Sequence, residues 1–399
     1  MLKVIVVGSG FGGLKLVREL KNNKNIKVTL ISDSLTFRYC PALYRTATGH
    51  RKRESIIPIG EIVNNYSNLT LTHAKIVKCE RKMRTIWDNN GKSYSYDILV
   101  FCLGVTTSYY GIPGVQDHAY GIKSPQAIDR LKKHLHDQLT VQHQPDKNYV
   151  IVGGGPTGVE LSAALSSYLK KIAKKHKTRR TKINLELIEA CPRILPSLSP
   201  KASAKVTKRL RRLKIKTLVG KKVESESDQC LMVSGRQIPT HSVIWTAGIT
   251  NNIFFARNKD QFVLNEHGKV IVSSNLQVDN NTFVIGDNAA TKYSGLAQTA
   301  IHNAKYVAKA INAISSEKSY QPYKDVTPVS IIPVGPHWAV LERKSLIISG
   351  FFASILRSWA DLIGYSDILG IKRAIKIWFF SRQLEEICPI CKTKPTTSF

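Results

Sequence analysis

The sequence has no uninterrupted apolar run of the roughly 18 residues that a membrane-spanning helix needs. A strand pattern begins within two residues of Met1, which leaves no room for the regions of a signal peptide. Cysteine is also scarce: the seven cysteines are scattered along 399 residues and do not suggest a disulfide framework. These absences predict a chain that stays in the cytoplasm, in a reducing environment, and does not cross a membrane.

Acidic residues are few, since 28 Asp and Glu stand against 59 Lys and Arg, which gives a formal net charge of +31. Two stretches, 168–182 and 201–216, each hold eight basic residues and no acid. Apolar residues recur through both, so we expect helices with basic faces, which serve either solubility or attraction to anionic lipid. No helix-turn-helix, zinc-finger or RNP pattern accompanies the charge, so nucleic acid is not an expected partner.

A glycine-rich turn follows the first predicted strand. Val4–Val7 is a continuous apolar run, as expected for a strand buried on both faces of a parallel sheet, and a helical pattern follows it. Gly8 permits a tight turn, Gly10 lets the backbone approach a pyrophosphate, and Gly13 allows the helix to pack closely on the strand. The N-terminus of that helix then faces the phosphates.

The same pattern occurs a second time. In "YVIVGGGPTGVELSAAL", Gly153, Gly155 and Gly158 have the spacing of the first three glycines and again stand between a strand and a helix. One such turn is a weak signal, but two copies in the same strand–turn–helix–strand context predict two dinucleotide sites.

An acidic residue closes each motif. The strand after the first turn ends near Ser32 and Asp33, and Asp33 is our candidate for binding a ribose hydroxyl. Glu189 is the candidate in the second copy. A carboxylate there accepts hydrogen bonds from the free 2′-hydroxyl of NAD and repels the 2′-phosphate of NADP, so the sequence favours NAD(H).

Two dinucleotides in one protein usually mean a bound flavin and a diffusing nicotinamide, because hydride passes between the two rings. The length also suggests two or three domains. We therefore expect an α/β fold with two Rossmann-like domains, FAD in the first and NAD(H) in the second.

Further segments resemble the two-dinucleotide flavoproteins of the pyridine nucleotide-disulfide oxidoreductase superfamily, which have the glutathione-reductase-like fold. "YDILVFCLGVTTSYYGIPG" resembles the exit from an FAD domain, with Gly104 at its turn, and "VIWTAGI", with Gly248, resembles the exit from an NAD domain. "TFVIGDNAA" resembles the strand end that places Gly286 and the carboxylate of Asp287 at the flavin ribityl chain. The order of these segments supports the resemblance.

Within that superfamily the sequence most resembles the type II NADH:quinone oxidoreductases, in "LELIEACPRILP", "GVELSAAL" and "GLAQTAIHNAKYVAKAI". The resemblance implies that Ala297 and Gln298 lie beside the flavin and the quinone, with His302 in place of a family glutamine. It also implies that Glu160 lies where the nicotinamide meets the flavin. The alternatives are that Gln298 and His302 only share an exposed helical face, and that Glu160 only complements a helix dipole.

Paired cysteines for dithiol exchange are missing. Relatives of glutathione reductase need a Cys-x4-Cys pair after the first flavin strand, and thioredoxin reductases need a Cys-x-x-Cys in the NAD domain. Cys40 stands alone in "RYCPALYRTATG". Exchange between dithiols and disulfides is therefore not the expected chemistry.

The C-terminal residues have a different composition, rich in aromatic and aliphatic side chains. In "ILGIKRAIKIWFF", Ile368, Ile371, Ile375 and Phe379 fall on one predicted helical stripe with basic residues beside it. Such a helix can lie in the headgroup region of a membrane; the alternatives are a homodimer interface or a cover over the flavin core. Cys388 and Cys391 have half the spacing of a zinc site and no nearby partner pair, so no metal is expected.

Together these patterns predict a discontinuous FAD domain (1–115 and 254–320), an NAD(H) domain (116–253) and a membrane-association region (321–399). The expected activity is hydride transfer from NADH to FAD, with electrons passing to menaquinone or ubiquinone at the cytoplasmic face of a membrane, without proton pumping. Two alternatives remain: a reductase with a soluble acceptor of the ferredoxin or rubredoxin type, and a flavin-bearing redox sensor with low turnover.

Overall fold

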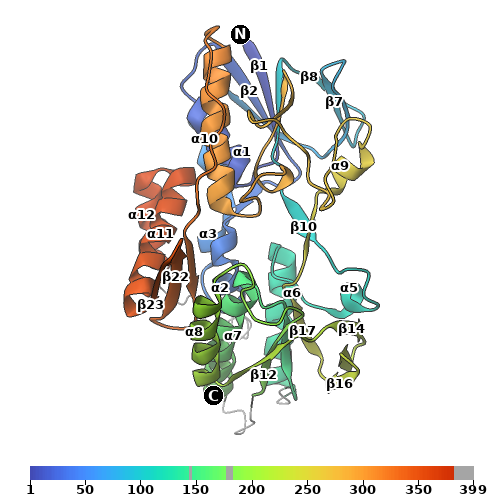
Figure 1. The fold of residues 1–399 in the computed structure, drawn as a ribbon, viewed down its shortest axis with the longest axis vertical. Helices are drawn as coiled ribbons and strands as arrows, with labels where there is room; N and C mark the ends of the chain where they lie inside the picture. The colour runs from blue at the N-terminus through green and yellow to red at the C-terminus, as the bar shows by residue number, and fades with distance from the viewer. Residues whose placement is uncertain (143–145, 177–182, 382–399) are drawn as a thin grey trace, which may run out of the picture.

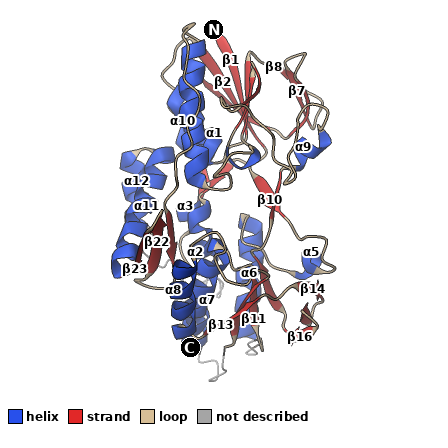
Figure 2. Ribbon diagram, in the orientation of Figure 1, coloured by secondary structure: helices blue, strands red, loops and turns tan. Residues whose placement is uncertain are grey.

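The computed structural model describes residues 1–142, 146–176 and 183–381 (Figure 1). Two parallel sheets lie one beyond the other along the long axis of the molecule, and a smaller C-terminal unit packs along one side. Helices and strands alternate through both large parts (Figure 2), so the fold is α/β, as predicted. Cys388 and Cys391 lie outside the described residues.

The first sheet has six strands, five of them parallel. In order they are β19 (Gln277–Asp279), which is antiparallel, then β20 (Thr282–Val284), β9 (Ile98–Phe101), β1 (Leu2–Val7), β2 (Ile26–Ser32) and β5 (Leu69–His73). Helices α1 (Phe11–Leu20) and α10 (Ala297–Ile314) pack on one face. The other face is covered by α9 (Ile253–Arg257) and the meander of β6 (Ile76–Glu80), β7 (Thr85–Asp88) and β8 (Ser93–Ser95). Cover on both faces explains why the central strands β1 and β9 contain continuous apolar runs.

The second sheet is smaller and has the same plan. Its four parallel strands are, in order, β13 (Ile215–Val219), β12 (Leu185–Glu189), β11 (Tyr149–Val152) and β17 (Ser242–Trp245). Helices α6 (Pro125–His136), α7 (Pro156–Lys175) and α8 (Pro200–Arg212) contribute to the core on one face. The other face carries α5 (Val115–His118) and the meander of β14 (Val223–Glu226), β15 (Cys230–Val233) and β16 (Arg236–Pro239). A π-helical turn, Asp137–Val141, follows α6.

The chain crosses between the two sheets on a pair of antiparallel strands, β10 (Val105–Thr107) and β18 (Ile249–Asn251). A second connection comes from the segment between β2 and β5. It contains β3 (Thr36–Arg38), the 3-10 turn Cys40–Ala42, α2 (Leu43–Ala47), α3 (Lys52–Ser55), β4 (Ile56–Pro58) and α4 (Ile59–Val63). Because α2 packs on α6 and α7, this segment joins the first sheet to the helices of the second. The predicted domain boundaries stay predictions.

The C-terminal unit is a three-stranded antiparallel sheet followed by two helices. The elements are β21 (Ser330–Pro333), β22 (Ala339–Arg343), β23 (Leu346–Gly350), α11 (Phe351–Leu369) and α12 (Ile371–Phe380). Along the described part of the chain, we find no helix with the length and apolar character that a membrane crossing requires.

One expectation for this region is wrong. The predicted stripe from Ile368 to Phe379 is not one helical face, because Gly370 adopts a positive φ of 84° and separates α11 from α12. Ile368 is therefore fully buried in α11, whereas Ile371 and Phe379 are 57% and 65% exposed on α12.

Candidate active site

The first glycine turn stands at the carboxyl edge of the first sheet, between β1 and α1. Gly8 has a positive φ of 108°, and a Cβ added there would lie 2.3 Å from the carbonyl oxygen of Cys102. A Cβ on Gly13 would lie 1.9 Å from the carbonyl oxygen of Gly8, so helix and strand pack at a distance that only glycine allows. A Cβ on Gly10 would meet nothing within 4 Å. The open space in front of Gly10 faces the helix N-terminus, as a pyrophosphate cradle requires.

The second glycine turn, between β11 and α7, repeats this geometry. Gly153 has the same φ of 108°, and a Cβ on Gly158 would again lie 1.9 Å from the carbonyl oxygen of the turn's first glycine. A Cβ on Gly155 would meet nothing within 4 Å. The residues present at both turns therefore fit the pyrophosphate of a dinucleotide.

The acids at the two strand ends differ in their surroundings. Glu189 lies against its own turn, because its Oε2 accepts from the Gly154 amide at 2.7 Å and its Oε1 from the Cys191 amide at 2.8 Å. Asp33 is exposed, and its backbone oxygen lies 3.3 Å from His73 Nε2. The residue that corresponds to Glu189 by strand register is Ser32, whose hydroxyl is 2.7 Å from that of Ser9.

Gly104, Gly286 and Asp287 meet at the same edge of the first sheet. The side chain of the buried Asn288 joins them, since its Nδ2 donates to the Gly104 oxygen at 2.7 Å and its Oδ1 accepts from the Gly104 amide at 3.0 Å. Burial raises the pKa of Asp287, while Lys269 acts in the opposite direction. Because the parallel strands end at one edge, these groups lie on the side of the sheet that carries the first glycine turn.

Gly248 lies between the two sheets. It has a positive φ of 72°, and its carbonyl oxygen accepts from Lys123 Nζ at 3.3 Å. Arg38, in the segment that joins the sheets, donates to the Lys123 carbonyl at 2.9 Å. Burial lowers the pKa of Lys123, and the neighbouring Cys40 raises it. Arg38 and Lys123 therefore link the segment that follows β2 of the first sheet to the carboxyl edge of the second sheet.

The predicted residues on α10 have different roles in the structure. Ala297 is the first residue of the helix. Gln298 is exposed, and its amide pairs twice with the backbone of Val329, donating at 2.9 Å and accepting at 3.1 Å. His302 is half-buried, and its pKa is lowered by burial and by Lys305, against the effect of Asp367 on α11. Gln298 thus fixes the chain that leads into β21, while His302 faces the C-terminal helices.

Glu160 lies on the first turns of α7, close to a buried ionic cluster. Burial raises the pKa of Glu160 to about 7; Arg357 lowers it, Asp361 raises it and Arg45 lowers it. In the cluster, the Asp361 carboxylate accepts from Arg45 Nη1 and from Arg357 Nη1, each at 2.8 Å. Arg45 Nε also lies 2.5 Å from the buried Glu54.

Sequence reasoning missed this cluster. Arg357 and Asp361 stand four residues apart in α11, which is rich in apolar residues, and an Arg–Asp pair at that spacing was the available signal. Their partner Arg45 comes from α2, more than 300 residues earlier, and only the tertiary fold brings them together.

Two largely parallel sheets, each with a glycine turn that fits a pyrophosphate at its carboxyl edge, are the architecture of an oxidoreductase with two dinucleotides. The family model described as pyridine nucleotide-disulphide oxidoreductase matches residues 2–304. The chain therefore belongs to the pyridine nucleotide-disulphide oxidoreductase family.

The chain is also similar to individual proteins along nearly its whole length. A type II NADH:quinone oxidoreductase of Staphylococcus aureus (strain NCTC 8325 / PS 47) is 24% identical over 94% of this chain and 98% of the relative. The structure of NDH2 from Plasmodium falciparum in complex with NADH has a TM-score of 0.84 at 18% identity, covering 96% of this chain and 100% of the other. The sulfide:quinone oxidoreductase of Aquifex aeolicus has a TM-score of 0.78 at 18% identity, covering 100% of both chains. The resemblance predicted from the motifs is confirmed.

Proposed function

We propose that this chain is a non-electrogenic NADH:quinone oxidoreductase that uses FAD and delivers electrons to a membrane quinone. The observation that carries the proposal is the pair of glycine turns with equal backbone geometry on two sheets whose carboxyl edges meet. The near full-length similarity to a type II NADH:quinone oxidoreductase supports the choice of acceptor.

The residues that would hold FAD belong to the first sheet. The amides at the start of α1, beside Gly10, would bind the pyrophosphate, and Asp287 would accept from the ribityl hydroxyls. When bound, FAD would supply the two-electron redox chemistry that side chains lack. The protein then has to bind FAD, to orient it and to exclude water from the site.

The residues that would hold NADH belong to the second sheet. The start of α7, beside Gly155, would bind the pyrophosphate. The Glu189 carboxylate already has its orientation fixed by two backbone amides, and each oxygen keeps a lone pair for a ribose hydroxyl. This arrangement supports NADH over NADPH, because a 2′-phosphate would face a carboxylate.

Glu160 would hold a proton near neutral pH, beside the meeting edges of the sheets. Its raised pKa of about 7 allows both the acid and the carboxylate at the working pH. We assign Gln298 and His302 to the acceptor side, next to the α11–α12 unit. Because the Gln298 amide is paired with Val329, its contact with a quinone requires that this pairing opens.

We assign membrane attachment to α11 and α12. Large apolar side chains are exposed on both helices, among them Phe352 at 76% and Ile363 at 62%. The formal charge of +31 adds attraction to an anionic surface. An apolar face with basic neighbours can lie in the headgroup region of a bilayer. We therefore assign the enzyme to the cytoplasmic face of the membrane as a peripheral protein. A second copy of the chain is the other occupant that would cover this face.

Anaerobic stopped-flow spectroscopy tests the proposal. The purified protein is mixed with NADH, and the flavin absorbance is expected to bleach. A menaquinone or ubiquinone analogue is then added, and the absorbance is expected to return. Bleaching without return, followed by reoxidation on adding a ferredoxin or rubredoxin, would replace the quinone by a protein acceptor. A long-lived reduced complex that neither acceptor reoxidises would favour the redox sensor.

A further inference from the structure

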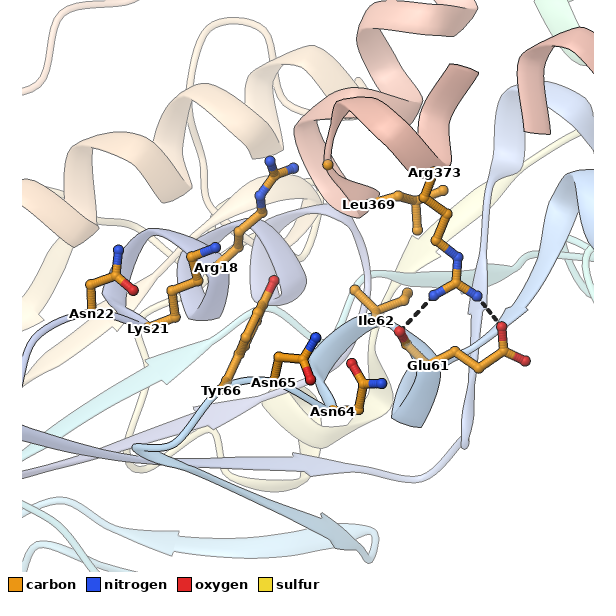
Figure 3. A pocket seen from close by; sticks show the side chains of 11 residues that line it. Arg18, Lys21, Asn22, Glu61, Ile62, Asn64, Asn65, Tyr66, Leu369 and Arg373 are labelled. Carbon is orange, nitrogen blue, oxygen red and sulfur yellow. Dashed lines mark hydrogen bonds and ion pairs between the residues drawn. The ribbon is translucent and has the colours of Figure 1, made fainter. Parts of the chain in front are cut away.

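A cavity of about 410 Å³ lies away from the dinucleotide edge of the first sheet (Figure 3). It is formed where α1 and α4 end and where α11 turns into α12. The glycine turn is at the N-terminus of α1, and the cavity is at its C-terminal end. The ten residues of α1, a length of about 15 Å, therefore separate the cavity from the phosphate cradle.

Basic side chains outnumber acidic ones around this cavity. Arg18, Lys21 and Arg373 bring positive charge, and Asn64 and Asn65 bring carboxamides. Glu61 is the acid among the lining residues, and its carboxylate pairs with the guanidinium of Arg373. Figure 3 shows that pair on one side of the cavity and Arg18, Lys21 and Tyr66 on the other.

The side of the cavity with Arg18, Lys21 and Tyr66 has hydrogen-bond donors that the described residues do not fully use. Arg18 uses Nη1 to donate to the backbone oxygen of Ser366 and keeps its positive charge. Lys21 Nζ lies 5.3 Å from the centre of the Tyr66 ring and forms no ion pair within the described ranges. Among those residues the Tyr66 hydroxyl has no hydrogen-bond partner either. Two cations and a phenol that line one cavity suit an anion with several oxygens, such as a phosphate ester.

The position of the cavity points to the source of such a phosphate. Leu369, Gly370 and Arg373 line it, and Ile371 and Ile375, on the same turn and helix, are 57% and 49% exposed. A helix with its apolar side in the acyl region holds its flanking cations at the level of the lipid phosphates. The donors of Arg18 and Lys21 then lie at headgroup level.

We propose that this cavity binds the phosphate of an anionic phospholipid headgroup and so fixes the α11–α12 turn at the membrane surface. The inference rests on the proposed membrane attachment. It adds a defined lipid site to a surface that otherwise works through apolar burial and general charge.

Vesicle flotation tests the site at about 0.15 M salt. One set of vesicles contains phosphatidylglycerol in a phosphate-free galactolipid, and the other contains the same molar fraction of oleate. The wild-type chain is expected to bind the phosphatidylglycerol vesicles about tenfold more tightly, a difference comparable to one or two basic residues at an anionic surface. Lys21→Glu, which leaves the Arg18–Ser366 contact in place, is expected to remove that difference.

Lys82→Glu is the matched control. Lys82 is an exposed lysine at the turn between β6 and β7, on the side of the first sheet away from α12 (Figure 1). The Lys82→Glu variant has the same charge reversal as Lys21→Glu and should keep the tenfold preference for phosphatidylglycerol vesicles. If both variants lose the preference equally, or neither does, the cavity does not bind the headgroup.

Two further arms separate the other outcomes. If millimolar glycerol 1-phosphate abolishes the preference of the wild-type chain, the ligand is a soluble phosphate ester and the lipid assignment is overturned. If the wild-type chain floats with neither vesicle, both the site and the proposed attachment are overturned. NADH oxidation with a water-soluble quinone is measured on the same samples. Lys21→Glu should leave it unchanged, so the oxidoreductase proposal stands or falls separately.

Discussion

The two glycine turns have the same backbone but different chemistry beside it. Their first glycines share a φ of 108°, and their last glycines leave room for no Cβ. At the strand end, the first copy has a Ser32–Ser9 hydroxyl pair where the second has the Glu189 carboxylate on the Gly154 amide. The two turns thus share their backbone geometry, and we expect selectivity between cofactors to lie in the side chains next to it.

A second difference between the two copies lies in the helix that follows each glycine turn. Lys15 on α1 corresponds to Glu160 on α7, and both approach α11. Lys15 Nζ pairs with Asp367 at 2.8 Å, while Glu160 is close to Arg357 and Asp361. One C-terminal helix therefore forms an ion pair with α1 beside the first turn. Beside the second turn it adds two opposing charges to the burial that raises the pKa of Glu160.

The largest effect is expected when the closest packed glycines are replaced. Gly13→Ala and Gly158→Ala each place a Cβ 1.9 Å from a carbonyl oxygen. Gly13→Ala should give protein without bound flavin. Gly158→Ala should keep the yellow flavin but lose its reduction by NADH, by about a hundredfold or more, since helix and turn must move apart. Absorbance spectra and stopped-flow reduction measure both.

Gly60→Ala is the control for this pair, because a Cβ there meets nothing within 4 Å. It should behave as wild type. Simultaneous loss of flavin and of NADH reduction in both variants would break the assignment of one cofactor to each turn.

The next largest effect is expected at Glu189. Glu189→Gln keeps the shape but removes the charge that orients the ribose and repels a 2′-phosphate. The KM for NADH should rise about tenfold, while NADPH improves relative to it. Steady-state kinetics with both nucleotides give the ratio. An unchanged NADH to NADPH ratio would move the selectivity to another residue.

A pH effect is expected at Glu160. Because the folded chain holds this proton up to about pH 7, above the usual range of a glutamate, the contribution of Glu160 to stability is lost as pH rises towards 7. Glu160→Gln should remove an inflection near pH 7 in turnover and in the free energy of unfolding. Arg357→Gln should move that inflection to higher pH, because the guanidinium lowers the pKa.

Lys15→Gln serves as the matched change at the first turn. It should lower stability and leave the inflection near pH 7 in place. An inflection that survives Glu160→Gln would assign the titration to another group.

The smallest effect is expected at Asp33. Its side chain is exposed, and Ser32 occupies the position that corresponds to Glu189. Asp33→Asn should change flavin retention less than about twofold, within the usual range for exposed sites. Ser32→Ala, which removes the hydroxyl partner of Ser9, should weaken retention more. Gel filtration followed by flavin quantification compares them, and the opposite order would support Asp33 as the ribose acid.

Local patterns predicted much of this fold. The strand–glycine–helix pattern can be recognised from residues that are adjacent in the sequence. The sequence therefore predicts the two parallel sheets and their turns. The break at Gly370 could not be predicted, because the helical pattern of apolar residues continues through it in the sequence. The positive φ of Gly370 in the structure shows that Ile368 and Ile371 have different surroundings. The partners of Glu160 come from α2 and α11, and no pattern within a single segment connects them.

The pairing of β9 with β20 affects the order in which the two sheets can fold during synthesis. Residues 98–101 reach their neighbour only after residues 282–284 have left the ribosome, while all four strands of the second sheet lie in between. During translation, the nascent chain therefore keeps one edge of its first sheet open while the second sheet is already able to fold. An open strand edge invites wrong pairing, so we expect slow elongation or a chaperone deficit to harm the N-terminal half first.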